Sequence, residues 1–117
     1  MIRYKSGVLT SARRNGVTCA VHDAIWKAID SVEFIWRKWG ADPWVTSLLD
    51  GRHRRGSLHY VGMAADFRSR DLPEAHKEEI VSELASDLGA DYDVILESRG
   101  RPNEHIHVEY QPKEPWG

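Results

Sequence analysis

The sequence has only one cysteine and no long hydrophobic run, and each absence excludes a class of protein. Cys19 alone allows neither an internal disulfide framework nor a zinc cluster built from several cysteines. No stretch without a charged residue approaches the roughly 18 apolar residues that a membrane span needs. The N-terminus also lacks the apolar core of a secretory signal. We therefore expect synthesis in the cytoplasm without a signal peptide, and no insertion into a membrane.

The length and composition are those of a small globular protein. A chain of 117 residues predicts one domain, 1–117, and 41% hydrophobic with 29% charged residues allows a real core. The net charge is only -2, but residues 1–56 carry ten Lys/Arg against five Asp/Glu, and residues 57–117 carry six against thirteen. The basic half could favour an anionic partner such as nucleic acid or a cell-wall polymer, although a solvated surface with internal charge pairing is the more common meaning of such a distribution. Because the chain is not basic overall and has no nucleic-acid-binding motif, we expect no nucleic-acid partner. We also expect the protein to be a monomer.

Hydrophobic spacing predicts two helices. From about Cys19 to Trp39, apolar residues recur at steps of three and four, and Gly40 follows as a C-cap. A second helix is expected from about Pro73 to Leu88, with Asp71 as its N-cap and Gly89 as its end.

Four short segments are expected to be strands: Pro43–Leu49, Met63–Arg68, Tyr92–Leu96 and His105–Tyr110. A polar loop, 50–56, separates the first two. The order helix, strand, strand, helix, strand, strand predicts an α+β domain with helices packed on one face of a mainly antiparallel sheet.

Four of the six histidines lie in two polar segments, Arg52–Asp66 and Glu104–Glu109, which could bind a metal. In SLHYVGMAAD, residues 57–66, alternation along a strand places Gly62, Ala64 and Asp66 on one face, which leaves room for an ion or a substrate. In EHIHVEY, residues 104–110, His105 and His107 share a face. A histidine pair alone is more often a surface feature, but the pairing of the two segments favours a site, since zinc prefers His and carboxylate ligands.

These residues resemble the family of zinc D-Ala-D-Ala carboxypeptidases, D-Ala-D-Ala dipeptidases and L-alanyl-D-glutamate endolysin peptidases, which share a fold with the hedgehog signalling domain. The family pattern is SxHxxGxAxD, followed after a helix by an acid three residues before a histidine. Here it reads Ser57, His59, Gly62, Ala64 and Asp66, then Glu104 and His107. The resemblance covers roughly residues 43–110, and the first 42 residues match no motif of the family.

The resemblance implies a role for each matching position. His59, Asp66 and His107 would be the ligands of a Zn²⁺ ion with water in the open fourth position, and Glu104 would be the general base. Ser57 would hold a ligand or its loop in place without binding the metal, and His105 would line the site without binding the metal.

The family's substrate-binding arginine ahead of the SxH motif has no clean counterpart here. Arg52 and His53 occupy the corresponding loop, and either could stabilise the oxyanion by a charged hydrogen bond. An ordinary solvated loop is an equal alternative at this point.

The function expected from the resemblance is a zinc peptidase that cleaves D-amino-acid-containing bonds in peptidoglycan, in stem peptides or cross-links. A small domain of this kind would suit a phage or prophage lysis enzyme, whose substrate is peptidoglycan or a muropeptide and which acts at the cell wall. Two alternatives stay open: a cytoplasmic D-Ala-D-Ala dipeptidase, and a noncatalytic zinc-binding interaction domain.

Overall fold

The structure of the chain is a computed structural model that describes residues 1–51 and 56–113. Its strands, helices and 3₁₀ turns (η) are, in chain order, β1 (Arg3–Tyr4), β2 (Ser11–Arg14), β3 (Val17–Ala20), α1 (Asp23–Lys38), β4 (Trp44–Ser47), η1 (Leu58–Val61), β5 (Ala64–Arg68), η2 (Glu74–His76), α2 (Lys77–Leu88), β6 (Tyr92–Glu97) and β7 (His105–Tyr110).

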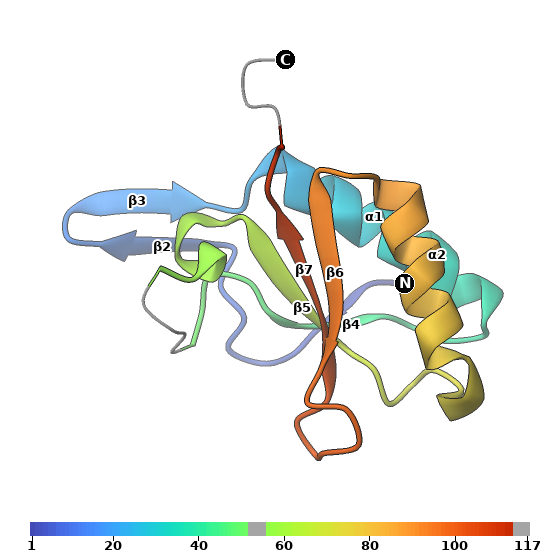
Figure 1. Ribbon diagram of the computed structural model, residues 1–117. Helices are drawn as coiled ribbons and strands as arrows, with labels where there is room; N and C mark the ends of the chain where they lie inside the picture. The colour runs from blue at the N-terminus through green and yellow to red at the C-terminus, as the bar shows by residue number, and fades with distance from the viewer. Residues whose placement is uncertain (52–55, 114–117) are drawn as a thin grey trace.

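Five strands form one mixed sheet in the order β1-β4-β5-β7-β6. The pairs β4–β5, β5–β7 and β6–β7 are antiparallel, whereas β1 and β4 are parallel. Both helices lie on the same side of this sheet (Figure 1). The predicted α+β class is therefore confirmed. The parallel pair was not expected, because β1 is only two residues long and too short to show a sequence pattern.

The helices cover the sheet because each has one apolar face. Ile25, Val32 and Trp36 of α1 are fully buried, as are Ile80 and Leu84 of α2. They form one core cluster with apolar side chains from the facing side of the sheet, including Val45, Phe67, Ile106 and Val108. The helices thus occupy one face, and the polar side chains of β5 and β7 are left on the other.

The first helix begins later than predicted. Val17–Ala20 is a strand that pairs with β2, and α1 starts at Asp23, where the His22 Nδ1 accepts from the Ala24 N–H at 3.0 Å. Asn15 and Gly16 have positive φ angles of 51° and 77° and form a two-residue hairpin turn. The Asn-Gly pair was the available signal for this hairpin, which projects from the sheet in Figure 1.

The predicted N-cap of the second helix is also wrong. Asp71 binds the guanidinium of Arg68 through both oxygens, at 2.8 and 2.7 Å, instead of capping a helix. A 3₁₀ turn, η2, precedes α2, and neither has a side-chain cap at its start. The predicted end is confirmed, since Gly89 follows Leu88 with a φ of 91°.

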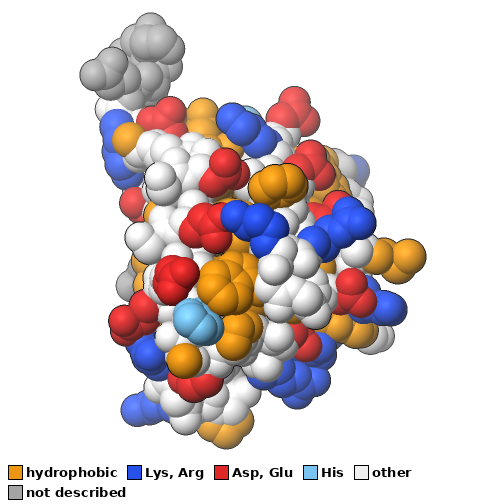
Figure 2. Space-filling view, turned by 90° about the vertical axis from the view of Figure 1, so that its right-hand side faces the viewer, with side chains coloured by type: hydrophobic (Ala, Val, Ile, Leu, Met, Phe, Trp, Pro, Cys, Tyr) orange, Lys and Arg blue, Asp and Glu red, His pale blue; other side chains and the backbone are white. Residues whose placement is uncertain are grey.

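The outer surface is mixed in charge. Figure 2 shows acidic and basic side chains interspersed with scattered hydrophobic ones on one side of the molecule. Neither helix of the described residues is long and apolar enough to cross a membrane.

Candidate metal centre

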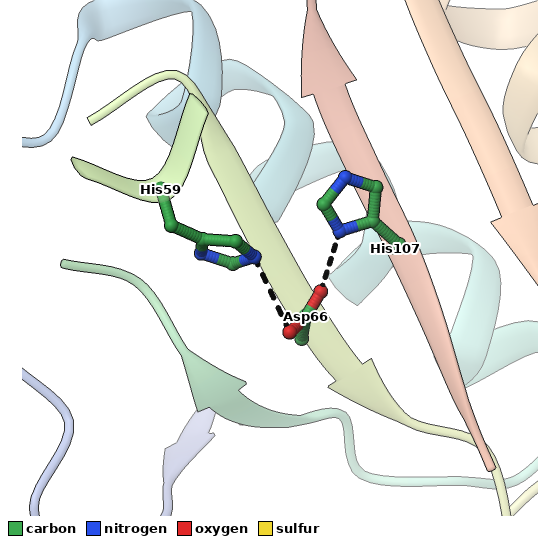
Figure 3. Close-up of side chains that lie close together, drawn as sticks. All are labelled: His59, Asp66 and His107. Atoms are coloured by element: carbon green, nitrogen blue, oxygen red, sulfur yellow. Dashed lines mark hydrogen bonds and ion pairs between the residues drawn. The ribbon is translucent and has the colours of Figure 1, made fainter. Parts of the chain in front are cut away.

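Three side chains from separate segments meet on the open side of the sheet. His59 comes from η1, Asp66 from β5 and His107 from β7 (Figure 3). Asp66 and His107 are direct partners across the β5–β7 ladder, so the sheet register itself places them together. All three residues are at least nine-tenths buried. Polar groups buried to this degree need polar partners, and these three side chains are partners of one another.

The turn that carries His59 is held by its neighbours. The Ser57 hydroxyl accepts from the His59 backbone N–H at 3.2 Å and starts the turn. Gly62 ends it at a φ of 74°, and a Cβ there would lie 2.2 Å from the Ala20 carbonyl oxygen. The glycine is therefore required by both its conformation and its close approach to β3.

The donor atoms are spaced as ligands of one small ion. His59 Nε2 lies 3.3 Å from Asp66 Oδ2, and His107 Nδ1 lies 2.7 Å from Asp66 Oδ1. One donor atom from each residue can be chosen so that all three lie within 4.8 Å of one another. Ligands about 2.1 Å from a tetrahedral metal are about 3.4 Å apart, so small movements suffice to hold one. This buried group of two nitrogens and a carboxylate could hold a metal ion.

Second hydrogen bonds orient both histidines toward the centre. His59 Nδ1 lies 2.7 Å from the Leu48 carbonyl oxygen, which can only accept, so Nδ1 carries the proton and Nε2 faces Asp66. His107 Nε2 lies 2.7 Å from a Glu109 carboxylate oxygen, so it donates there and directs Nδ1 to Asp66. Outer hydrogen bonds of this kind are what fixes the tautomer of metal-binding histidines.

The pKa values show how strongly the three groups are coupled. Burial raises the pKa of the Asp66 carboxyl, but hydrogen bonds with His107 and His59 outweigh burial and hold the pKa well below its usual range. Burial lowers the pKa of His107, but its bonds to Asp66 and Glu109 raise it to about 9. A metal that binds His107 Nδ1 must therefore displace a proton, as metal binding to histidine generally does at pH values below the histidine pKa.

Two further residues border the centre. His105 Nε2 lies 3.7 Å from Asp66 Oδ1, so it lines the site without joining the group of three. Glu97, which the sequence reasoning missed, places Oε1 3.7 Å from His107 Nδ1 and 4.0 Å from His105 Nε2. The signal that could have found it is the register of β6 against β7, in which Glu97 is the direct partner of His105.

Glu104 lies in the loop just before β7, as a role beside His107 requires, but its carboxylate is already bonded. Lys77 Nζ and Ser69 Oγ both donate to Oε1 at 2.6 Å, and the Gly100 N–H donates to Oε2 at 2.9 Å. The bonds from Lys77 and Ser69 lower the pKa of Glu104 to about 2. Glu104 is thus ionised at neutral pH, but it is a weak base while these donors hold it.

A cleft of about 890 Å³ connects these groups. Asp66, His105 and Glu104 all line it, so one of the three candidate ligands and the candidate base open onto the same space, whereas His59 and His107 are not among the lining residues. Thr46 and Ser47 of β4 form part of another wall. A volume of this size suits a short peptide or a comparably small ligand.

Arg52 and His53, the candidate oxyanion-binding residues, lie outside the described residues. A scan against protein-family models and a search of curated proteins found no match to this chain. The resemblance to the zinc peptidases therefore depends on the motif residues themselves, and the peptidase fold and family stay predictions.

Proposed function

We propose that the chain is a zinc metallopeptidase that hydrolyses D-amino-acid-containing peptide bonds in peptidoglycan, as a phage or prophage lysis enzyme would. The observation that carries the proposal is the buried group of His59, Asp66 and His107 beside an open cleft. Two nitrogens and one carboxylate oxygen, with room for a fourth ligand, form the donor set of many catalytic zinc sites.

The residues fit zinc in both number and orientation. His59 would bind through Nε2 and His107 through Nδ1, because Leu48 and Glu109 occupy the other nitrogens. Zinc held there would act as a Lewis acid and make water available as a nucleophile near neutral pH. Asp66 would supply the third ligand and offset part of the metal's charge.

Glu104 would accept the proton of the attacking water and pass it to the leaving amine. Its low pKa keeps it ionised, and because it lines the cleft it would lie near a substrate bound there. To act, the carboxylate must exchange the bond from Ser69 or Lys77 for one to the reacting water, and substrate entry could drive this exchange.

A second candidate, a noncatalytic zinc-binding domain, is favoured by one observation. The Glu104 carboxylate is held by three donors, an arrangement suited to fixing the loop before β7. If Glu104 serves only this structural purpose, zinc would bind without hydrolysis.

Incubation of the purified protein with peptidoglycan distinguishes the two. The peptidase proposal predicts that mass analysis will find newly released stem-peptide fragments, that chelator will abolish their release and that added zinc will restore it. Stoichiometric zinc with no fragments from peptidoglycan or from soluble muropeptides would contradict the peptidase and favour the binding domain.

A further inference from the structure

The cleft beside Asp66 has an excess of cationic side chains over acidic ones. Among the described residues that line it, five are Lys or Arg and three are Asp or Glu. They are Lys5, Arg68, Arg70, Lys77 and Arg101 on the one hand, and Asp66, Glu74 and Glu104 on the other. The mixed surface in Figure 2 shows no comparable excess of one sign.

Internal ion pairs account for two of the five cations. Arg68 binds both carboxylate oxygens of Asp71. Lys77 is buried, and its Nζ lies 2.6 Å from a carboxylate oxygen of Glu74 and 2.6 Å from one of Glu104, so its charge is shared between these two acids. These two cations are occupied by the protein and are not available for a ligand.

The other three cations, Lys5, Arg70 and Arg101, have no ion-pair partner within residues 1–51 and 56–113. Their side chains are exposed, and they come from three distant segments of the chain. We refer to Lys5, Arg70 and Arg101 as the cationic wall.

The backbone around each member of the cationic wall is fixed by hydrogen bonds or by paired neighbours. The Lys5 N–H donates to the Val45 carbonyl oxygen at 2.9 Å and continues the pairing of β1 with β4. Arg70 stands between Ser69, which binds Glu104, and Asp71, which binds Arg68. The Arg101 N–H donates to the Ser98 carbonyl oxygen at 3.0 Å. The three cations thus lie around the cleft on anchored segments.

We propose that the cationic wall binds a free carboxylate of the peptide substrate. This inference rests on the proposed function, which places the scissile bond at the candidate metal centre. Arginine suits the role because its planar guanidinium can bind a carboxylate through two parallel hydrogen bonds.

The carboxylate could come from two positions of a stem peptide. A C-terminal carboxylate would make the enzyme a carboxypeptidase, whereas the carboxylate of a D-glutamate residue would suit an endopeptidase. The charge of the cationic wall would suit either carboxylate. Blocking each carboxylate in turn shows which of the two it binds.

The test is an NMR titration of the protein as purified with L-Ala-γ-D-Glu-L-Lys-D-Ala-D-Ala. The same peptide amidated at D-glutamate, at the C-terminus or at both is titrated in parallel, and cleavage of each sample is followed by mass spectrometry. We expect each of Lys5→Gln, Arg70→Gln and Arg101→Gln to raise Kd for the free peptide about threefold, and the triple variant to raise it at least about tenfold. The matched control is Arg37→Gln, an exposed cation on α1, which should leave Kd unchanged.

Amidation of the recognised carboxylate should weaken binding to the wild type by about as much as the triple substitution does, and should have no further effect on the triple variant. Raising the salt concentration should weaken only the wild type, because salt screens exposed charges. The proposal is overturned if the doubly amidated peptide binds as tightly as the free one, if Arg37→Gln has the same effect, or if no peptide binds. Carboxylate-dependent binding without cleavage would support the cationic wall and contradict the peptidase. Cleavage that is unaffected by amidation and by the wall substitutions would support the peptidase and contradict the cationic wall.

Discussion

Asp66 and Glu104 are two carboxylates of one cleft in different surroundings. Their side chains are 13% and 9% exposed, and both have a pKa below the usual range. Asp66 lies between two histidines, whereas Glu104 is held by an ammonium, a hydroxyl and a backbone N–H. Similar burial and similar pKa directions therefore arise from different chemistry.

The difference decides which carboxylate can serve a metal. A histidine can lose a proton and turn a lone pair to the ion, so the partners of Asp66 become its fellow ligands. Lys77 and the Gly100 N–H can only donate, so the partners of Glu104 keep it ionised but offer a metal nothing. The Asp66 group is thus the one of the two that could hold a metal ion, and in the proposed function Glu104 would serve proton transfer or anchor the loop.

The largest effect should follow from removing a ligand. His59→Ala deletes the Nε2 donor and the bond to the Leu48 carbonyl, so we expect loss of bound zinc and of zinc-dependent hydrolysis. Metal analysis and fragment release check this. The matched control is His76→Ala, an exposed histidine in η2, which should keep both. Full zinc content in His59→Ala would remove this histidine from the ligand set.

The next effect is on turnover at Glu104. Glu104→Gln keeps the shape of the side chain but removes the base, so kcat should fall by about 100-fold or more while zinc content is unchanged. Single-turnover assays with zinc quantified in the same sample measure both. A variant with zinc and full activity would reassign the base, and Glu97, Glu109 and His105 would be the next candidates.

A smaller effect concerns stability in acid. The pKa of Glu104 is about 2 in the folded chain against an ordinary value of 4.5, so its stabilisation is present above about pH 4.5 and is lost as the pH falls toward 2. Urea unfolding of chelator-treated protein between pH 7 and 3 should show a shallower loss of stability in Glu104→Gln than in the wild type. Identical slopes would contradict the assigned pKa.

The smallest effect should come from Ser57. Ser57→Ala removes the acceptor for the His59 N–H and leaves the ligand itself in place. Loss of such a cap costs about 1 kcal/mol, so we expect zinc affinity to fall by no more than about tenfold. Competition with a coloured zinc chelator measures it. A loss as complete as that of His59→Ala would mean that Ser57 is itself a ligand.

Much of the sheet could be predicted from the sequence because it depends on local alternation, whereas the choice of His59, Asp66 and His107 as one metal group came from the motif resemblance. The predicted strand His105–Tyr110 has the bounds of β7, and its alternation correctly placed His107 opposite the core residues Ile106 and Val108. Asp66 follows the same rule on β5. Once two strands are antiparallel neighbours, residues of one face become direct partners.

What could not be predicted depends on contacts between distant segments. The Lys77 bond to Glu104 joins α2 to the loop before β7, and no local pattern encodes it. The role of Glu97 required the register of β6, and the pairing of Asp71 with Arg68 displaced an expected helix cap. The hairpin at Asn15 and Gly16 differs, because its turn signal was present and the helical spacing of the following apolar residues obscured it.

The most direct test of the central claim is the metal content of the protein together with its melting temperature. The three candidate ligands come from η1, β5 and β7, so an ion joining them should stabilise the fold. We predict about one zinc per chain in protein prepared without chelator, a lower Tm after chelation and recovery of the original Tm on adding zinc. Protein that contains no zinc, and whose Tm is unchanged by added zinc, would contradict the account.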